Sequence, residues 1–346
     1  MRMAKPQPIG EYHFERPVEF LRTLMPGTAR WYKKGKSSPR SWYFRGHGDA
    51  RWELLPSIFR KALPHHDEFD AWRTRTRSDT LRLEVLAIRD FVSEANRVGL
   101  HVPGTSNAIR DLDGADEALW KPMDRSVEDG EWWPPDHLLE AFALAQHFGL
   151  PTRLLDWSRN PLSAAYFAAH DAITEAANTG PRDGRASTTT TRARPSAPPT
   201  HLAVWCLNKP FYARLFGFSK RFALIQTPSA SNPRVHAQSG VFTIDRYTGP
   251  SSAMRYTPPA LDEAIAQAHQ TASDPLLRDV RDYSPGLVKI CLPIGRAPEL
   301  LQLLDEHGVT ASTLFPGFSS VVQTLYDRVP LVLPSYVPAF RRLLNS

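Results

Sequence analysis

The chain has 346 residues, with 42 Lys or Arg against 36 Asp or Glu, and a formal net charge of +6 at pH 7. This length suffices for one large domain or two ordinary ones. A chain of this size can bury a hydrophobic core large enough to be stable without a metal or a disulfide. The positive charge indicates some affinity for polyanions, either nucleic acid or a phosphate-bearing ligand. A GC-rich genome is the simpler explanation for the abundant arginine and the 31 prolines.

The distribution of apolar residues and of cysteines argues against a membrane-spanning protein, a secreted protein and a cysteine-bound metal site. No run of 18 apolar residues occurs, and the N-terminal residues lack the apolar region of a secretion signal. We therefore expect a cytoplasmic protein without membrane association. Cys206 and Cys291 each lie in a short apolar run typical of a buried strand, without metal-ligand spacing, so both are expected to be core thiols. No metal site is predicted.

Hydrophobic periodicity predicts the elements of the first half of the chain. An amphipathic helix over 17–24 precedes a strand over 41–45 that ends at Gly46, and a long helix covers 81–98. Residues 99–136 are polar, with scattered Gly, Asp and Pro, so an irregular excursion is predicted. Asp136 is expected to cap a helix over 137–148 that ends at Gly149. A further helix begins near Asn160 and Pro161.

The second half begins with a low-complexity segment. Residues 178–200 are rich in Thr, Arg, Pro and Ser and cannot bury enough apolar surface to order themselves, so a disordered insertion within one fold is predicted. Strands are then predicted around Trp205, over 235–244 and over 287–292, with a helix over 261–271. A helix over 297–307 ends at Gly308, and a strand over 310–314 and a short helix over 319–325 follow. The expected fold class is α+β, a single mixed domain whose small, mostly antiparallel sheet is flanked by helices.

Several short motifs together resemble the FRG domain family of bacterial proteins. The matching segments are Trp42-Tyr43-Phe44-Arg45-Gly46, Leu54-Leu55-Pro56, Phe59-Arg60, residues 145–158 (AQHFGLPTRLLDWS), Asn160-Pro161-Leu162, Tyr166-Phe167-Ala168, residues 238–242 (QSGVF), Gly308-Val309 and Leu314-Phe315-Pro316. The resemblance implies an FRG domain over 15–330, between an N-terminal tail of 1–14 and a C-terminal tail of 331–346. Because the family implies little chemistry, function has to be argued from the site.

The same motifs are similar to the first two motifs of the Arg-Ser-Glu group of ADP-ribosyltransferases. This similarity implies an ADP-ribosyltransferase-like fold that uses NAD as substrate, with Arg45 on its phosphates and residues 152–158, including Ser158, at the nicotinamide. Gln238 stands where those enzymes have a catalytic glutamate. Another carboxylate would then have to stabilise the sugar cation, and Glu140 and Asp156 are the candidates.

Other side chains near these motifs are candidates for holding the nucleotide. A guanidinium binds a pyrophosphate bidentately, and Gly46 beside Arg45 would leave room for the phosphate. His147, near a helix end, is a candidate general base or phosphate donor. The remaining candidates are two polar residues for the anion site and three aromatic residues for the base: Thr152, Arg153, Tyr43, Trp157 and Tyr166.

Most of these residues also have a purely structural interpretation. Arg45 and Asp156 would form a buried ion pair, and Ser158 would sit at a helix cap. Arg153 would cover apolar surface, His147 would cap its helix, and Trp157 would belong to the core. Strand alternation places Tyr43 and Phe44 on opposite faces, and Phe44 is predicted to be the core residue.

The leading hypothesis is an NAD-dependent ADP-ribosyltransferase or NAD glycohydrolase. It would be a toxin or phage-defence effector that acts on a nucleic acid or a protein, with an antitoxin or regulatory partner. A non-catalytic module that binds nucleotide or nucleic-acid phosphates would equally explain the missing glutamate, since no bond is then broken. A metal-free nuclease that uses His147 and Asp156 as an acid–base pair is the third alternative.

Overall fold

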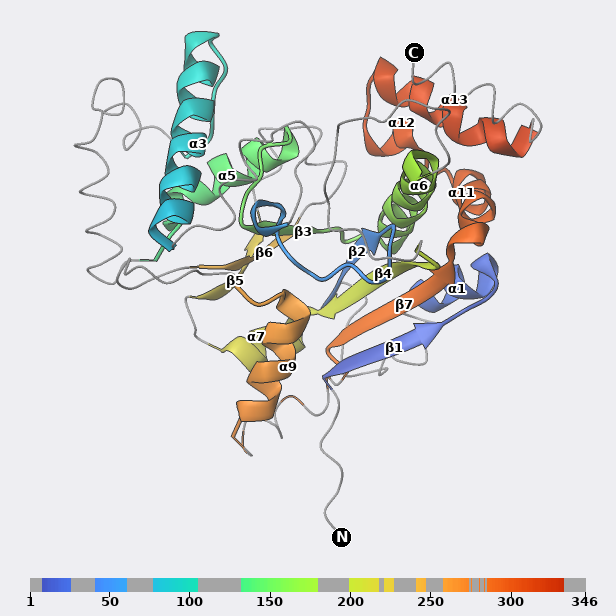
Figure 1. The fold of residues 1–346 in the computed structure, drawn as a ribbon, viewed down its shortest axis with the longest axis horizontal. Helices are drawn as coiled ribbons and strands as arrows, with labels where there is room; N and C mark the ends of the chain where they lie inside the picture. Colours follow the sequence, from blue (N-terminus) through green and yellow to red (C-terminus); the bar gives the residue numbers. More distant parts are fainter. Residues whose placement is uncertain are drawn as a thin grey trace.

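The structure is a computed structural model that describes residues 8–25, 41–60, 77–104, 132–179, 199–217, 221–226, 241–246, 258–273, 275, 280, 283 and 285–332. Two separate small sheets and the helices packed on them make up the described part (Figure 1). The fold class is α+β, as the sequence predicts, but the structure has two small sheets where one was expected.

The larger sheet has four strands in the order β1-β7-β4-β2. They are β1 (Ile9–His13), β7 (Leu287–Pro293), β4 (His201–Asn208) and β2 (Trp42–His47). The pair β1–β7 is parallel, and the pairs β7–β4 and β4–β2 are antiparallel. The sheet is therefore mixed and mostly antiparallel, with β1 and β2 at its two edges.

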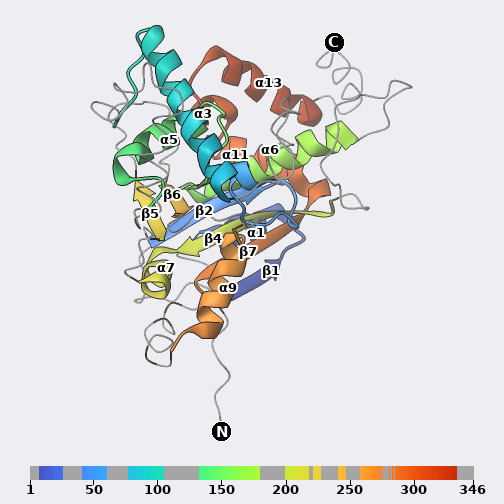
Figure 2. The ribbon, with the colours of Figure 1, turned by 60° about the vertical axis from the view of Figure 1, so that its left-hand side comes forward.

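Helices cover the larger sheet on both faces. On one face lie α1 (Pro17–Leu24), α6 (Pro161–Thr179) and α11 (Ala297–Glu306), over a core that includes Phe44, Val204 and Ile290. On the other lie α7 (Lys209–Phe216) and α9 (Leu261–Thr271), over Tyr43 and Trp205 (Figure 2). Because both faces are covered, the central strand β4 is apolar along most of its length rather than alternating.

The smaller sheet is antiparallel, in the order β3-β6-β5, with strands β3 (Leu154–Trp157), β6 (Val241–Asp245) and β5 (Phe222–Gln226). The helices α3 (Arg77–Arg97) and α5 (Leu139–His147) share a hydrophobic core with it. A β-bridge between Phe44 and Ser158 joins the two sheets, with N···O distances of 2.8 and 2.7 Å. The end of β3 therefore lies beside β2.

The strand β2 and the helix α6 approach each other unusually closely. A Cβ on Gly46 would lie 2.1 Å from the carbonyl oxygen of Ala164, and one on Gly48 would lie 2.6 Å from the backbone nitrogen of Ala172. The predicted strand accordingly continues through Gly46 to His47. The α6 backbone occupies the space where a Cβ of Gly46 would lie, so close helix packing requires a glycine at this position.

The helices predicted over 17–24, 81–98, 261–271 and 297–307 and the strands around Trp205 and over 287–292 are confirmed. The predicted strand over 310–314 is wrong, because Thr310 caps the short helix α12 (Ala311–Leu314) in a capping box with Thr313. The last described helix, α13 (Phe318–Val332), is longer than predicted.

Other boundaries differ from the predicted ones. The 3₁₀ helix η5 (Asp136–Leu138) precedes α5, and Asp136 pairs with Arg246 instead of capping a helix. The prediction that Gly149 ends α5 and Gly308 ends α11 is confirmed. Both glycines have the left-handed backbone conformation, with φ of 96° and 73°. Strand β1 lies in the expected N-terminal tail, and the 3₁₀ helices η2 (Ser57–Phe59) and η7 (Ile294–Arg296) are additional elements.

Some predictions fall on other parts of the chain. Residues 105–131 of the expected excursion, 180–198 of the expected disordered insertion, 235–240 of a predicted strand and 333–346 lie outside the described residues. Within the described part, no helix has the length and apolarity needed to cross a membrane. Cys206 and Cys291 are buried and form no disulfide, and burial raises the pKa of the Cys206 thiol.

Candidate functional site

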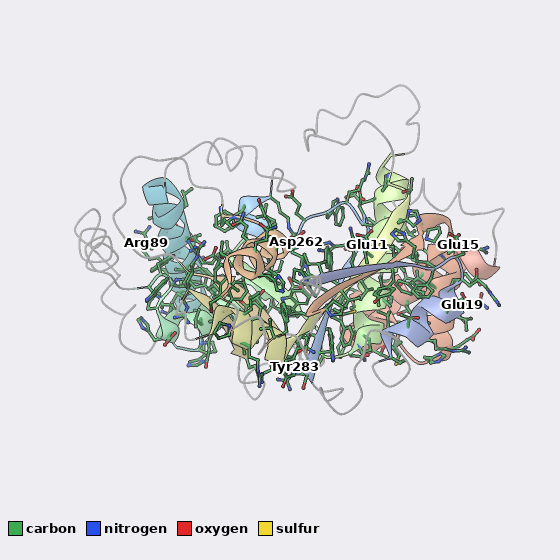
Figure 3. All side chains as sticks on the ribbon, turned by 90° about the horizontal axis from the view of Figure 1, so that it is seen from below. Glu11, Glu15, Glu19, Arg89, Asp262 and Tyr283 are labelled. Atoms are coloured by element: carbon green, nitrogen blue, oxygen red, sulfur yellow. The ribbon has the colours of Figure 1, made fainter. Side chains whose placement is uncertain are left out.

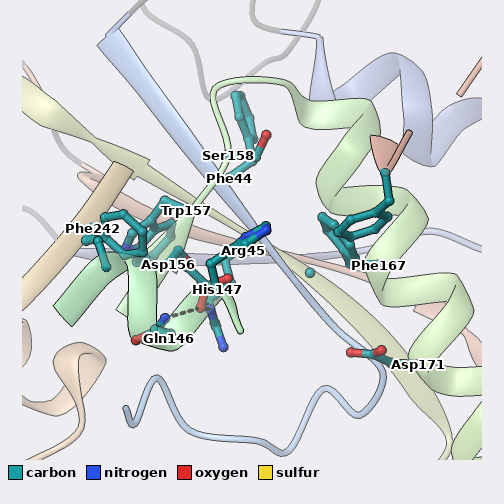
Figure 4. Close-up of a pocket in the computed structure, with 13 residues that line it drawn as sticks. Phe44, Arg45, Gln146, His147, Asp156, Trp157, Ser158, Phe167, Asp171 and Phe242 are labelled. Atoms are coloured by element: carbon teal, nitrogen blue, oxygen red, sulfur yellow. Dashed lines mark hydrogen bonds and ion pairs between the residues drawn. The ribbon is translucent and has the colours of Figure 1, made fainter. Parts of the chain in front are cut away.

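A cavity of about 320 Å³ lies beside β2, where the two sheets meet. Three polypeptide segments predicted to be functional converge on it: the end of β2, the end of α5 and the strand β3 (Figure 4). The lining residues are Phe44, Arg45, Gly46, Ala143, Gln146, His147, Asp156, Trp157, Ser158, Phe167, Asp171, Phe242 and Phe315. The cavity therefore combines a charged cluster with an aromatic wall.

Arg45 is held in place by two neighbours. Its NH1 group donates to Asp156 Oδ1 at 2.6 Å and to the Asp156 carbonyl oxygen at 2.9 Å, and its Nε donates to His47 Nε2 at 3.0 Å. Burial, together with the charges of Arg45 and Arg60, holds the pKa of His47 well below its usual value, so the ring is neutral and accepts this hydrogen bond. The NH2 group of Arg45 donates to no residue in the described part of the chain.

The ion-pair interpretation of Arg45 is thus correct, and it coexists with a position in the cavity wall. A guanidinium with two of its nitrogens fixed by protein groups presents its third in one orientation. This arrangement would orient NH2 for a hydrogen bond to an anionic ligand in the cavity. Binding of that ligand would then cost little side-chain entropy of Arg45.

The carboxylate of Asp156 is ionised near neutral pH. Its side chain is 60% exposed toward the cavity. Desolvation by the surrounding protein raises its pKa. The charge and hydrogen bond of Arg45 outweigh this effect and hold the pKa below its usual value. Gln146 Nε2 adds a hydrogen bond at 3.3 Å, and the Thr152 hydroxyl donates to Gln146 Oε1. Thr152 therefore orients the amide that contacts Asp156.

A second carboxylate enters the cavity from the opposite side, on α6. Burial raises the pKa of Asp171 to about 6, although the charges of His170 and Arg45 oppose the shift. No residue in the described ranges donates a hydrogen bond to it. Figure 4 shows Asp171 facing the cavity from α6, across from Asp156, Arg45 and His147. The cavity thus contains one ionised aspartate and one that exchanges its proton near neutral pH.

Ser158 and Trp157 have structural roles in addition to lining the cavity. The Ser158 hydroxyl accepts from the backbone nitrogen of Asn160 at 3.0 Å, which supports the turn into α6. The Trp157 side chain is 2% exposed and donates to Thr243 Oγ1 at 3.0 Å, so it belongs to the core as well. His147 lines the cavity from the last turn of α5.

Two residues expected in the anion site and base pocket lie elsewhere. Arg153 forms a buried ion pair with Glu84 of α3, with Nε donating at 2.8 Å, so it is directed away from Arg45. Tyr166 donates from its hydroxyl to Asp327 of α13 at 2.6 Å and stacks on His170. Both are corrections to the sequence analysis, and both have the same physical reason: each side chain has a closer charged partner on a neighbouring helix.

The assignments of the remaining candidates also change. Tyr43 packs in the core shared with α7 and α9 and does not line the cavity, and Phe44, predicted to be core alone, is both buried and part of the cavity wall. Glu140 lies on α5 but does not line the cavity. Gln238 lies outside the described residues.

Asp171 lies outside the motifs identified from the sequence, whereas Phe167, Phe242 and Phe315 lie within them but were not assigned to the site. Phe167 and Asp171 are spaced i and i+4 and so share one face of α6, but only the packing of α6 on β2 shows that this face meets the cavity.

Comparison with known proteins bears on the segments that build the cavity. No curated protein and no solved structure matches the chain. The model of the FRG domain family matches residues 40–177, a range that includes β2, α5 and β3 and nearly all of α6. The resemblance predicted over 15–330 is thereby confirmed for this part, which supplies Arg45, Asp156 and Asp171. The chain therefore contains an FRG domain at residues 40–177.

Proposed function

We propose that the FRG domain of this chain is an enzyme that cleaves the bond between nicotinamide and ribose in NAD, as an ADP-ribosyltransferase or an NAD glycohydrolase. One observation carries the proposal: two aspartates with pKa values shifted in opposite directions share a cavity with Arg45. Such pairs divide the roles of charge stabilisation and proton transfer in enzymes.

Asp156 is the group that stabilises positive charge. When the C1′–N bond breaks, its electron pair goes to the nicotinamide nitrogen, and the ribose becomes an oxocarbenium-like cation. The ionised Asp156 favours this cation electrostatically, and its hydrogen bonds to Arg45 and Gln146 fix its orientation beforehand. This carboxylate takes the place of the glutamate that Gln238 does not supply.

Asp171 is the general base. The acceptor, an alcohol or water, forms a new bond to C1′ through its oxygen and gives up its proton to Asp171, which later releases it to solvent. A base with a pKa of about 6 is largely deprotonated at pH 7 and close to the operating pH. Products are therefore nicotinamide, the ADP-ribosylated acceptor or ADP-ribose, and one proton.

Arg45 and the aromatic wall bind the substrate. The NH2 group of Arg45, which has no partner among the described residues, would donate to an oxygen of the diphosphate. Phe44, Phe167, Phe242 and Phe315 offer apolar faces to the nicotinamide ring and keep water from the cation. A volume of about 320 Å³ is at the lower end of that of ligand pockets, so it suits the nicotinamide half of NAD, with the adenosine toward the opening.

The biological role is part of the same proposal. An enzyme that consumes NAD or modifies nucleic acid or protein suits a toxin or phage-defence effector, and its host needs an antitoxin or regulatory partner to restrain it. The net charge of +6 favours a nucleic acid among the acceptors.

The test is nicotinamide release from NAD by the purified chain at pH 7, alone and with RNA, DNA or cell lysate. We expect release by the wild type and a loss of about 10²- to 10⁴-fold for Asp171→Asn, the range of general-base catalysis. Asp156→Asn should also lose activity, whereas Asp90→Asn, which alters an exposed residue of α3, should not.

Absence of release under all these conditions would contradict the proposal. Salt-sensitive binding of a nucleotide or RNA without release would then favour the phosphate-binding module, because phosphate contacts weaken as salt is added.

A further inference from the structure

A cluster of potential metal ligands lies at the other edge of the larger sheet, remote in the strand order from the cavity at β2. Glu11 and His13 of β1 and Cys291 of β7 place one ligand atom each within 4.8 Å of the others. His13 and Cys291 are direct partners in the β1–β7 register. Figure 3 shows Glu11 on β1, in the view of the sheet from below.

The strand geometry explains why these side chains meet. Glu11 and His13 are two residues apart, so they point to the same face of β1, and their partners Lys289 and Cys291 point to that face from β7. The alternating residues Val288, Ile290 and Leu292 pack under α6 and α11 on the opposite face. The backbone of the sheet therefore holds the cluster together.

The three ligand types are those that bind zinc, and their spacing is nearly sufficient. At zinc bond lengths of about 2.0–2.3 Å, ligand atoms of a tetrahedral site lie about 3.3–3.8 Å apart. Here His13 Nε2 lies 3.0 Å from Glu11 Oε1, and Cys291 Sγ lies 4.0 Å from the same oxygen. The ligand atoms of His13 and Cys291 lie within 4.8 Å of each other, so shifts of about 1 Å or less bring all three atoms to the spacing of a tetrahedral site.

The neighbouring charges are compatible with a bound cation. Lys289 Nζ lies 3.9 Å from Glu11 Oε2, whereas the other oxygen, Oε1, faces His13 and Cys291. The carboxylate can therefore bind a metal through one oxygen and keep its contact to the ammonium through the other. Lys289 also lies over the Trp205 ring, 5.2 Å from its centroid, which holds it to the side of the cluster.

The surroundings also restrict the histidine and leave one side open. The ring of His201 packs edge-on against His13, with centroids 5.4 Å apart, and limits its orientation. Cys291 is buried, while the side chains of His13 and Glu11 are 54% and 50% exposed. A metal held by these three groups would thus have a fourth position accessible to water.

From this geometry we propose that Glu11, His13 and Cys291 bind one Zn²⁺ ion, with water as fourth ligand. Binding displaces the proton of the Cys291 thiol to solvent, and the thiolate, imidazole nitrogen and carboxylate oxygen become the ligands. The ion cross-links β1, which is an edge strand, to the central strand β7. The site lies at the opposite edge of the larger sheet from β2, so it is independent of the function proposed for the cavity.

The experiment is a titration of the metal-stripped full-length chain with Co²⁺ and then Zn²⁺. We expect one equivalent of Co²⁺ to give a thiolate-to-cobalt charge-transfer band, displaced by Zn²⁺, and Zn²⁺ to raise Tm because it binds the folded chain. His13→Ala, at a half-exposed position, should weaken binding by more than ~100-fold, since loss of an outer-shell partner alone costs about 10- to 100-fold.

Matched variants decide which sulfur is involved. The chain has two cysteines, so Cys206→Ala should keep the charge-transfer band and Cys291→Ala should abolish it. Absence of the band in the wild type, or Co²⁺ and Zn²⁺ affinities unchanged in both His13→Ala and Cys291→Ala, would overturn the proposal. In that case the cluster is a Glu–His–Lys charge network with a core thiol beside it.

Discussion

Replacing Asp171 by asparagine is expected to stabilise the fold while it reduces activity. Burial raises the pKa of Asp171 from 3.8 to about 6. The folded state therefore binds this proton more tightly than the unfolded state, and stability falls as pH rises from about 4 to about 6. A shift of about two pKa units corresponds to about 3 kcal/mol at about 1.36 kcal/mol per unit, as an upper limit. Above pH 6 the wild type bears this whole cost, and the neutral asparagine bears none of it.

Urea unfolding at pH 7 and pH 4 measures the difference. Asp171→Asn should raise the midpoint at pH 7 and leave it nearly unchanged at pH 4, where the wild-type carboxyl is protonated too. Asp156→Asn is the matched control with the opposite sign, because Arg45 lowers the pKa of Asp156 and its ionised form stabilises the fold at neutral pH. If Asp171→Asn instead destabilised the chain at pH 7 as Asp156→Asn does, the division of roles between the two aspartates would be refuted.

Three further predictions concern the stability of the fold, through a close backbone contact, a buried ion pair and a helix cap. Gly46→Ala should cost about 1–3 kcal/mol or more, because the new Cβ meets the α6 backbone, whereas Gly295→Ala enters open space and should change stability by less than about 0.5 kcal/mol; thermal unfolding compares them. Glu84→Gln leaves the buried Arg153 without its counter-charge and should cost about 3–5 kcal/mol in urea unfolding, so a loss below about 1 kcal/mol would contradict a buried pair. Asn208→Ala removes the hydrogen bond that caps α7 and should cost about 1 kcal/mol in thermal unfolding, so an unchanged Tm would contradict the cap.

The sequence predicts helices and central strands better than edge elements. The long helix α3 and the strand around Trp205 have strong apolar patterns, because whole faces of them are buried. Strand β1 has only five residues, of which two are charged or exposed, and its pairing with β7 joins segments almost 280 residues apart. Residues 310–314 include two β-branched threonines, which favour a strand, but the capping box of Thr310 and Thr313 starts a helix there.

The site was predictable as far as its motifs extend. Arg45, Asp156 and Ser158 lie in short motifs, and the structure brings all three to one cavity. Asp171 enters the cavity because α6 packs directly on Gly46 and Gly48, a tertiary contact that linear spacing does not reveal. For the same reason the partners of Arg153 and Tyr166, which come from α3 and α13, could not be identified from the sequence.

The most direct test of the central claim is the rate of nicotinamide release from NAD as a function of pH, for the wild type and for Asp171→Asn. We predict that the wild-type rate rises with pH to a plateau with a midpoint near 6, as the base loses its proton, and that the variant is slow at every pH. A variant as active as the wild type, or a wild type that releases no nicotinamide at any pH, would contradict it.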